Sequence, residues 1–360
     1  MKFLIITNHS YMLWQFRREL IEALLQRGEV VIGTPFVGHE KDFEELGCRC
    51  VETKLERRGK NLLQEAALFE RYRKLLQREK PDLVITYSIK PNIYAGLLSQ
   101  KMKIPYCSNV QGLGTAFQSQ KSAAAVSVLY RAGLKKAKTV FFENTENASV
   151  FVERRIIPQS KITVLSGAGI NLDRFPVQPY PSEEQGIRFL YLGRIMREKG
   201  MDEWFSVAQR MKAEFGNKAQ FDMVGFFEDD YKHVVEELAQ KSVIHFYGFQ
   251  EDPGPYYAAA HCVVLPSWHE GMSNVLLEAA ATGRAVITND IPGCREAVEA
   301  GKTGFLTRAK DAESLYQTMV AFLTLSPEDR EKMGQRGRKK MESEFDKKRV
   351  VKETLDAIGV

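Results

Sequence analysis

Short apolar runs alternate with longer amphipathic segments from the first residues of the chain onward. Residues 2–6 read Lys-Phe-Leu-Ile-Ile and predict a buried strand. In residues 13–27 apolar side chains recur at intervals of three and four, which predicts an amphipathic helix that stops at Gly28. Residues 30–34 predict the next strand. A β-α-β rhythm of this kind is typical of a parallel sheet with crossover helices.

The same alternation continues to about residue 165 and then restarts after a proline-rich stretch. Further helices are predicted at 62–79, 93–102 and 123–136, and further strands at 82–87, 106–110, 139–143, 162–165, 187–192, 220–224, 244–247, 262–265 and 285–288. We therefore expect an α/β protein with two Rossmann-like domains, each with a parallel sheet. The expected division is an N-terminal domain over 1–170, a linker over 171–186, a C-terminal domain over 187–342 and a last helix within 343–360.

Length and composition agree with this division. A chain of 360 residues favours two domains over one, and 44% hydrophobic with 27% charged residues is the composition of a soluble globular protein. The apolar runs are far shorter than the roughly 18 to 20 residues needed to cross a bilayer. The five cysteines lack CxxC or Cys/His spacing, which argues against a disulfide framework or a zinc site and favours the cytoplasm.

The net charge of +5 hides an asymmetry between the two halves of the chain. Residues 1–170 hold 26 Lys and Arg against 16 Asp and Glu, and the remaining residues hold 25 against 30. A basic half can attract nucleic acid, anionic lipid headgroups or phosphate-bearing substrates. Nucleic acid is the least favoured of these partners, because no aromatic and basic surface motif is evident.

Two common nucleotide-binding motifs are missing. The pairs Gly112 with Gly114 and Gly167 with Gly169 are fragments of the dinucleotide fingerprint GxGxxG, and both lack the third glycine. No P-loop is present either. These absences argue against a dehydrogenase and an NTPase, and they favour a ligand held in the cleft between two sheets.

The loop after the predicted strand 187–192 carries candidate phosphate-binding cations. Ligands of open α/β sheets lie beyond the carboxyl ends of the strands, where Arg194 and Lys199 occur. A departing nucleoside diphosphate gains negative charge, which a positioned Arg and Lys can stabilise without a metal ion. Gly193 and Gly200 would let the backbone approach the phosphates closely. The acidic run 228–230 is interpreted as a solvated helix start rather than a metal site.

The loop after the predicted strand 262–265 leads into a helix expected to begin near Ser273. Backbone N–H groups at the positive end of that helix would form a diphosphate site, contributed by Gly271, Met272, Ser273 and Asn274. Glu278, about one and a half turns further along, suits a carboxylate that accepts hydrogen bonds from a ribose. Glu270, before the turn, is expected beside the donor sugar and the bond that breaks.

Two further loops complete the expected donor site. The loop 289–296 follows the next strand and would close the pocket with Gly293. Gly248 and Phe249 follow the strand 244–247, where backbone groups could meet the edge of a nucleobase, although Phe249 could instead be a packing residue. Each charged residue in these loops could be an ordinary surface charge when taken alone. The joint pattern favours one site.

These motifs resemble glycosyltransferase family 4. The resemblance rests on Gly193-Arg194, Glu198-Lys199-Gly200, the pair Glu270 and Glu278 spaced by eight, Ala279-Ala-Ala-Thr-Gly283 and Pro292-Gly-Cys-Arg-Glu-Ala297. It implies the GT-B fold, in which two Rossmann-like domains face a cleft, and transfer from a nucleotide sugar, most often UDP-linked, with retention of anomeric configuration. It also implies that Arg194 and Lys199 bind the diphosphate, with Glu270 as a third catalytic residue beside the sugar, and that no metal cofactor is needed.

The N-terminal half resembles bacterial enzymes that extend sugars on undecaprenyl diphosphate for capsule, O-antigen or glycan assembly. The stretches that carry this likeness are 8–17, 87–94 and 109–117. They imply an acceptor that is a polyprenyl-diphosphate-linked saccharide, and a donor of the UDP-GalNAc type. The candidate acceptor-binding residues are Asn8, His9, Ser10, Lys90 and Gln111.

Two positions in these acceptor stretches depart from the family pattern. Many family members have a Gly-Gly pair where this chain has Asn8-His9-Ser10, and many have a histidine where it has Gln111. Glutamine cannot exchange a proton at neutral pH, so no general base is assigned.

An acceptor of this kind lies in an anionic membrane leaflet, and attraction to that leaflet would account for the positive charge of the N-terminal half. We expect a cytoplasmic protein in peripheral contact with the inner face of the membrane. The candidate membrane patch consists of Arg57, Arg58, Lys60, Lys121, Arg131, Lys135, Lys136 and Lys138 with Phe117 and Leu129. Solvated helix faces are the alternative for these residues. Alternatives for the whole chain are a GT-B sugar-nucleotide epimerase, a phosphorylase and a catalytically silent saccharide-binding partner.

Overall fold

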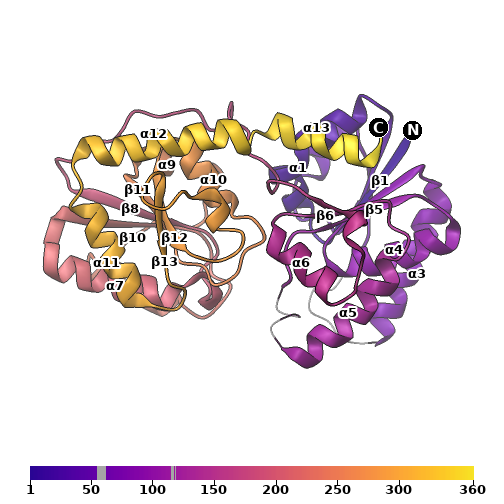
Figure 1. Ribbon diagram of the computed structural model, residues 1–360, viewed down its shortest axis with the longest axis horizontal. Coiled ribbons are helices and arrows are strands. Elements are labelled where there is room, and N and C mark those ends of the chain that lie inside the picture. The colour runs from indigo at the N-terminus through magenta and orange to yellow at the C-terminus, as the bar shows by residue number, and fades with distance from the viewer. Residues whose placement is uncertain (55–61, 115–116, 118) are drawn as a thin grey trace. The chain divides into compact units, whose positions relative to one another are not determined.

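The computed structural model describes residues 1–54, 62–114, 117 and 119–360. Backbone contacts divide the chain into two compact units. The N-terminal unit consists of Met1–Ala168 together with Lys347–Val360, and the C-terminal unit consists of Gly169–Asp346. Each unit is a twisted parallel sheet covered by helices (Figure 1).

The sheet of the N-terminal unit has seven parallel strands in the order β3-β2-β1-β4-β5-β6-β7. Its strands are β1 (Lys2–Ile6), β2 (Glu29–Thr34), β3 (Arg49–Glu52), β4 (Leu83–Tyr87), β5 (Tyr106–Val110), β6 (Val140–Phe142) and β7 (Ile162–Val164). Its helices are α1 (Ser10–Leu25), α2 (Glu40–Glu45), α3 (Leu62–Glu79), α4 (Ile89–Met102), α5 (Gln120–Leu134), α6 (Thr145–Glu153) and α13 (Lys347–Ile358).

Both faces of this sheet are buried, so β1 reads as a continuous apolar run. Leu4 and Ile6 point to the side covered by α3, α4 and α5, and Phe3 and Ile5 point to the side covered by α1 and α13. Lys347 at the start of α13 donates a hydrogen bond from Nζ to the carbonyl oxygen of Phe16 in α1, at 3.1 Å. The C-terminal end of the chain is therefore part of the N-terminal unit.

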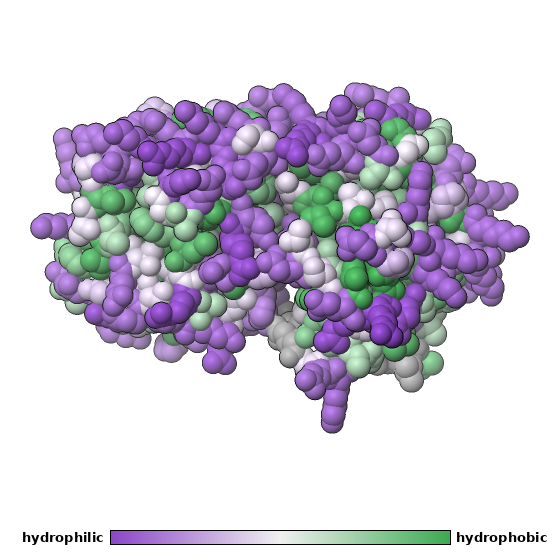
Figure 2. All heavy atoms as spheres, in the orientation of Figure 1, coloured by the Kyte–Doolittle hydropathy of each residue, from purple (hydrophilic) through white to green (hydrophobic). Residues whose placement is uncertain are grey.

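The sheet of the C-terminal unit has six parallel strands in the order β10-β9-β8-β11-β12-β13. Its strands are β8 (Ile187–Leu192), β9 (Ala219–Val224), β10 (His245–Phe246), β11 (Cys262–Leu265), β12 (Ala285–Asn289) and β13 (Gly304–Thr307). Its helices are α7 (Met201–Phe215), α8 (Lys232–Gln240), α9 (Gly254–Ala259), α10 (Asn274–Ala281), α11 (Ala312–Leu323) and α12 (Pro327–Glu344). The face seen in Figure 2 is largely hydrophilic, with smaller hydrophobic areas between the hydrophilic residues.

The sequence prediction missed four short elements, α2, β3, α6 and β13. These elements are four to nine residues long, and strand β3 is a partly exposed edge strand with too few apolar positions to show a period. The last helix, α13, begins at Lys347, inside the range 343–360, because Phe345 is the C-cap of α12. Within the described residues, no helix is both long and apolar enough to cross a membrane.

The proline-rich segment expected as a linker is fixed to the C-terminal unit by three arginines. Arg284 is 1% exposed and donates to the carbonyl oxygens of Gln178 and Pro179, at 3.2 and 2.7 Å. Arg338 donates to the carbonyl oxygen of Phe175 at 2.8 Å. The third arginine, Arg330, pairs with Glu183 of this segment.

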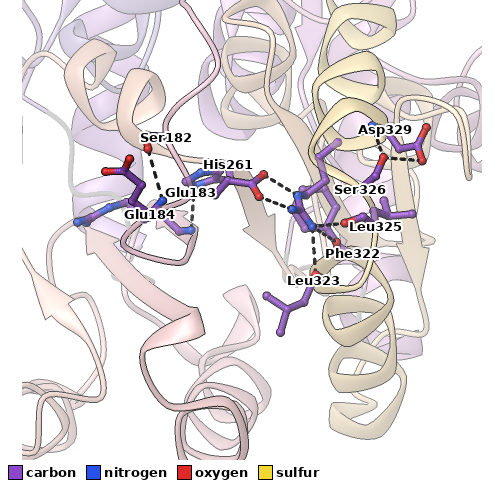
Figure 3. A network of polar contacts seen from close by, with 11 residues as sticks. Ser182, Glu183, Glu184, His261, Phe322, Leu323, Leu325, Ser326 and Asp329 are labelled. Carbon is purple, nitrogen blue, oxygen red and sulfur yellow. Dashed lines mark hydrogen bonds and ion pairs between the residues drawn. The ribbon is translucent and has the colours of Figure 1, made fainter.

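Arg330 lies in a largely buried polar network whose acceptors Glu183, Phe322, Leu323 and Leu325 are labelled in Figure 3. Its guanidinium donates two hydrogen bonds to the Glu183 carboxylate, at 3.0 and 2.6 Å. It also donates to the carbonyl oxygens that end α11, those of Phe322, Leu323 and Leu325. One planar side chain thus links the segment before β8 to the connection between α11 and α12.

We expect the Arg330→Met replacement to lower the free energy of unfolding of the C-terminal unit by about 3 kcal/mol, because it leaves a partly buried carboxylate and several carbonyl oxygens without their donor. Urea unfolding followed by circular dichroism measures the loss. Arg336→Met is the matched control, since Arg336 is an exposed residue of the same helix. Equal effects of the two replacements would contradict this role of Arg330.

Candidate active site

Glycine backbones hold three loops together at the carboxyl end of the C-terminal sheet. The N–H of Gly193, after β8, donates to the carbonyl oxygen of Val224 at 3.0 Å, and the N–H of Gly225, after β9, donates to that of Gly248 at 2.9 Å. A Cβ atom on Gly225 would lie 1.8 Å from the carbonyl oxygen of Gly193. The loop after β9 can approach the loop after β8 this closely only because Gly225 lacks a side chain.

A second close approach joins the loop after β8 to the loop after β11. Gly200 has a φ of +73°, and a Cβ atom there would lie 2.1 Å from the carbonyl oxygen of Pro266. The N–H of Trp268 donates to the carbonyl oxygen of Glu198 at 2.8 Å. The residue between Glu198 and Gly200 is Lys199, so these contacts place Lys199 against the loop that carries Glu270.

Lys199 and Glu270 form an ion pair, and their side chains are 14% and 13% exposed. Two buried groups lie near the Glu270 carboxylate. The pKa values of the Tyr191 hydroxyl and the Cys294 thiol are both raised, first by burial and next by the negative charge of Glu270. The ammonium of Lys199 is therefore held at a largely desolvated position, where a second anion would interact with it strongly.

Arg194 lies in the same loop as Lys199, and hydrogen bonds hold both its side chain and its backbone. Its guanidinium pairs with Glu228 at 2.6 Å, and its carbonyl oxygen accepts a hydrogen bond from the Tyr191 hydroxyl at 2.6 Å. The interpretation of 228–230 as a solvated helix start was wrong, because α8 begins only at Lys232 and Asp229 accepts the N–H of Arg197 at 2.8 Å. The acidic run orients the cationic loop.

The loop after β12 packs on the start of α10. The N–H of Ser273, the N-cap residue of α10, donates to the carbonyl oxygen of Gly293 at 2.8 Å. That N–H is therefore engaged, and the expectation of four free N–H groups at this helix start was wrong for Ser273. Gly293 has a φ of +84°, and a Cβ atom there would lie 2.4 Å from the carbonyl oxygen of Gly271. Met272 and Asn274 lie on either side of Ser273 at the same helix start.

Glu278 is oriented by a buried tyrosine that sequence reasoning missed. The Tyr257 hydroxyl donates to Oε2 of Glu278 at 2.8 Å. Burial, followed by the nearby Glu278 charge, raises the pKa of Tyr257 well above its ordinary value, so the hydroxyl stays a donor. Arg284 in turn donates to the carbonyl oxygen of Tyr257 at 2.9 Å. Tyr257 lies 21 residues before Glu278, and no local sequence pattern joins the two.

Phe249 is exposed and pairs with a second aromatic residue. The rings of Phe226 and Phe249 meet edge to face with centroids 6.0 Å apart, and the two residues are 46% and 53% exposed. Each follows directly after a glycine of the hydrogen-bonded pair Gly225 and Gly248. Phe226 was not predicted as a site residue, because its position beside Phe249 depends on strand order.

Three of the candidate acceptor residues surround the start of α1 in the N-terminal unit. Asn8 accepts a hydrogen bond from the Ser88 hydroxyl at 2.8 Å. His9 is the N-cap residue of α1 and packs edge to face on Tyr11. The Ser10 hydroxyl is buried, donates to the carbonyl oxygen of Gly38 at 3.0 Å and accepts the N–H of Val37. Ser10 thus braces the loop after β2.

The remaining two candidates lie after β4 and β5. Lys90, in the first turn of α4, pairs with Glu65 at 2.6 Å, and the Tyr94 hydroxyl donates to the same carboxylate at 2.7 Å. Lys90 therefore has a charged partner and is not a loop lysine without one. Gln111 donates from Nε2 to the sulfur of Met12 at 3.4 Å. The structure thus distributes the five candidates over the ends of three strands of one sheet.

The residues of the described part of the chain contain no group of three or more His, Cys, Asp or Glu side chains placed to hold a metal ion. In the C-terminal unit, the site instead presents two cations, Arg194 and Lys199. Such groups can bind a diphosphate and stabilise negative charge that develops on it.

Comparison with protein families assigns both units. A glycosyl transferase 4-like domain matches residues 13–168, and a domain of the glycosyl transferases group 1 matches residues 186–324. The chain is 26% identical over 329 residues to the N,N'-diacetylbacillosaminyl-diphospho-undecaprenol alpha-1,3-N-acetylgalactosaminyltransferase of Campylobacter jejuni, with 86% of each protein covered. It is 26% identical over 265 residues to the UDP-Gal:alpha-D-GlcNAc-diphosphoundecaprenol alpha-1,3-galactosyltransferase of Escherichia coli, covering 69% of this chain and 67% of that protein.

Solved structures agree on the fold. HepE of Anabaena, crystallised with UDP and glucose, superposes with a TM-score of 0.83 at 16% identity and covers 100% of this chain and 99% of that one. Sucrose-phosphate synthase of Thermosynechococcus elongatus gives 0.77 at 20% identity, with 99% and 98% covered. The expected family and the expected fold are confirmed. The chain belongs to the family 4 glycosyltransferases, hexosyltransferases that join a 4-like domain to a group 1 domain on the GT-B fold.

Proposed function

We propose that this glycosyltransferase moves an N-acetylhexosamine or hexose, of the UDP-GalNAc type, onto a saccharide linked to undecaprenyl diphosphate, with retention of anomeric configuration. The proposed setting is bacterial capsule, O-antigen or glycan assembly. The Campylobacter jejuni and Escherichia coli relatives are named for acceptors on diphospho-undecaprenol and for α-linked products. HepE, which shares the fold, is described in complex with UDP-glucose.

The proposed donor site is supported above all by the ion pair of Lys199 and Glu270. The pair lies where the loop after β8 packs at Gly200 against the loop after β11. A diphosphate bound there would meet the Lys199 ammonium, and Arg194 would approach it from the same loop. Both cations are already positioned by carboxylates, Glu270 and Glu228, so little reorganisation is needed when the substrate binds. Glu270, once Lys199 turns to the phosphate, would face the donor sugar.

In the proposed reaction the bond between the anomeric carbon and the diphosphate oxygen breaks, and the diphosphate takes the electron pair. Lys199 and Arg194 stabilise the charge that develops. An acceptor hydroxyl oxygen bonds to the anomeric carbon on the same face, and its proton passes to the departing phosphate oxygen. No protein nucleophile or general base is required.

The test is product analysis with the purified chain. UDP-GalNAc, UDP-GlcNAc, UDP-galactose and UDP-glucose are each offered with a diphosphate-linked saccharide on a short polyprenol. We expect one donor to give UDP and a lipid product one sugar larger by mass spectrometry. Conversion of the nucleotide sugar without acceptor would indicate an epimerase instead, and dependence on inorganic phosphate would indicate a phosphorylase.

Glu278→Gln is expected to raise the KM for the nucleotide sugar by about 10-fold or more while kcat changes less, because a carboxylate that accepts hydrogen bonds from a ribose binds ground state and transition state alike. Steady-state kinetics with varied donor measures the split. Tyr257→Phe removes only the hydroxyl that orients the carboxylate and should raise KM less. A fall in kcat at unchanged KM would argue against this role of Glu278.

A further inference from the structure

Helix α5 presents an apolar stripe that stays exposed among the residues that the structure describes. The helix packs on α4 through a face that includes Ala123, Ser127 and Tyr130. On the opposite side Val128 is 58% exposed and Leu129 is 45% exposed. The exposed positions between and beside them carry small apolar side chains, Ala124, Ala125 and Ala132. In Figure 1 the helix forms the lower edge of the N-terminal unit.

Cations lie at both ends of this stripe. Lys121 occupies the first turn of α5, and Lys135 and Lys136 follow its last residue, all three exposed. At 100° per residue, Lys121, Lys135 and Lys136 project within about 60° of Val128 or Leu129. Arg131, at the margin, is exposed while its guanidinium donates to the carbonyl oxygens of Arg154 and Arg155. None of these four cations forms an ion pair with a carboxylate among the described residues.

The surrounding sequence contains no acid to neutralise them. Residues 83–142 include eight Lys and Arg and not one Asp or Glu. An apolar stripe between lysines, without acidic residues, matches an anionic lipid surface, because apolar side chains enter the acyl boundary while long cationic side chains reach the headgroups. Interfaces with a protein partner are, by contrast, depleted in lysine and alanine, the two residue types that dominate this surface.

The membrane patch expected from the sequence changes in two respects. Phe117 is left out of the patch, because its partly buried ring stacks on Phe151 at 5.8 Å, against the core. Lys138 donates to the carbonyl oxygen of Ile358 at 2.6 Å and so ties α13 to the unit. Arg57, Arg58 and Lys60 lie outside the described residues. Leu129, Lys121, Lys135 and Lys136 stay in the patch, and Val128 joins them.

We propose that the outer face of α5 binds the surface of an anionic bilayer, with Val128 and Leu129 inserted at the headgroup boundary and Lys121, Lys135 and Lys136 against the lipid phosphates. The helix lies along the surface and does not cross it. This contact is separate from the donor site, and it would bring the N-terminal unit to the leaflet from which a lipid-linked substrate is taken.

The experiment is flotation of the full chain with vesicles of phosphatidylcholine alone or with phosphatidylglycerol added. We expect binding to the anionic vesicles and little to the neutral ones. Replacing each lysine is expected to weaken partitioning about fivefold. The pair Lys135→Glu and Lys136→Glu should therefore reduce it by about 25-fold or more. The pair Val128→Ser and Leu129→Ser should reduce it by about tenfold.

The matched control is the pair Lys218→Glu and Lys332→Glu, which makes the same change in net charge on exposed positions of the C-terminal unit. It should leave vesicle binding within about threefold of the unaltered chain. Equal losses in the control and the α5 variants would overturn the proposal, as would equal binding to both kinds of vesicle or no binding to either.

Sugar transfer to a water-soluble, short-chain acceptor separates this contact from the proposed function. All the α5 variants should keep that activity within about twofold, since Val128, Leu129 and the lysines are outside the donor site. Loss of vesicle binding with soluble transfer intact supports the α5 face as a lipid-docking surface. Loss of soluble transfer along with vesicle binding would show that the replacements disturb the unit itself, and would contradict the assignment.

Discussion

Replacing Lys199 by methionine should lower kcat for sugar transfer by about 10²–10³-fold, the range found when one positioned electrostatic group is removed from a transition state. Methionine keeps the length of the side chain and removes its ammonium. The charge that develops on the leaving diphosphate would then lose the cation that the Glu270 loop holds at a largely buried position. Single-turnover transfer with saturating nucleotide sugar measures the chemical step separately from product release.

Two comparisons show whether the Lys199 effect is specific. Lys218→Met, at an exposed position of the same unit, should leave kcat unchanged. Glu270→Gln keeps Lys199 but removes the charge that holds it, and should also lower kcat. A loss below about tenfold for Lys199→Met, with normal UDP binding, would contradict the role given to this ammonium.

Gly200→Ala should disrupt the site through the backbone. The new methyl group would lie 2.1 Å from the carbonyl oxygen of Pro266, so the loop that carries Lys199 would have to move away from the loop that carries Glu270. We expect kcat to fall by about 10²-fold, because small displacements of positioned groups are costly in catalysis. We also expect the C-terminal unit to lose about 2–4 kcal/mol of unfolding free energy from overpacking and backbone strain together.

The control for Gly200→Ala lies at the opposite end of helix α7. Gly216, the C-cap residue, has a φ of +58°, and a Cβ atom there would have no neighbouring atom within 4 Å. Gly200, the N-cap residue, has both a positive φ and the close contact. Gly216→Ala should therefore cost only the backbone strain of its φ of +58° and ψ of −127°, about 1–3 kcal/mol, and leave kcat unchanged. If both replacements lowered kcat alike, close packing of the loops would not be what positions Lys199.

Much of the fold follows from the sequence because the central strands are buried on both faces. Strand β11 shows as an uninterrupted apolar run and β8 as an apolar run broken only by Arg188, and the predicted bounds of both match those observed. Edge and short elements such as β3 lack that signal, since a half-exposed strand of four residues has no measurable period.

The candidate site was predictable as a set of loops and unpredictable in its contacts. Arg194, Lys199, Glu270 and Glu278 were found because chemistry in an open α/β sheet concentrates after the strands. Their supporting partners were not found, since the pairing of Arg194 with Glu228 spans 34 residues and depends on which strands are neighbours. Ser273 was predicted to offer a free N–H to the diphosphate, but the carbonyl oxygen of Gly293 already accepts that N–H. The sequence could not reveal this contact, because Gly293 belongs to a neighbouring loop.

The most direct test of the central account is the anomeric configuration of the product. The purified chain would be given UDP-GalNAc, or whichever UDP-sugar it turns over, with the diphosphate-linked saccharide acceptor, and the new linkage would be examined by NMR. The account predicts an α linkage made from the α-linked donor, together with one UDP released per bond formed, and loss of both in Lys199→Met. A β linkage, or UDP release that is unchanged in Lys199→Met, would contradict it.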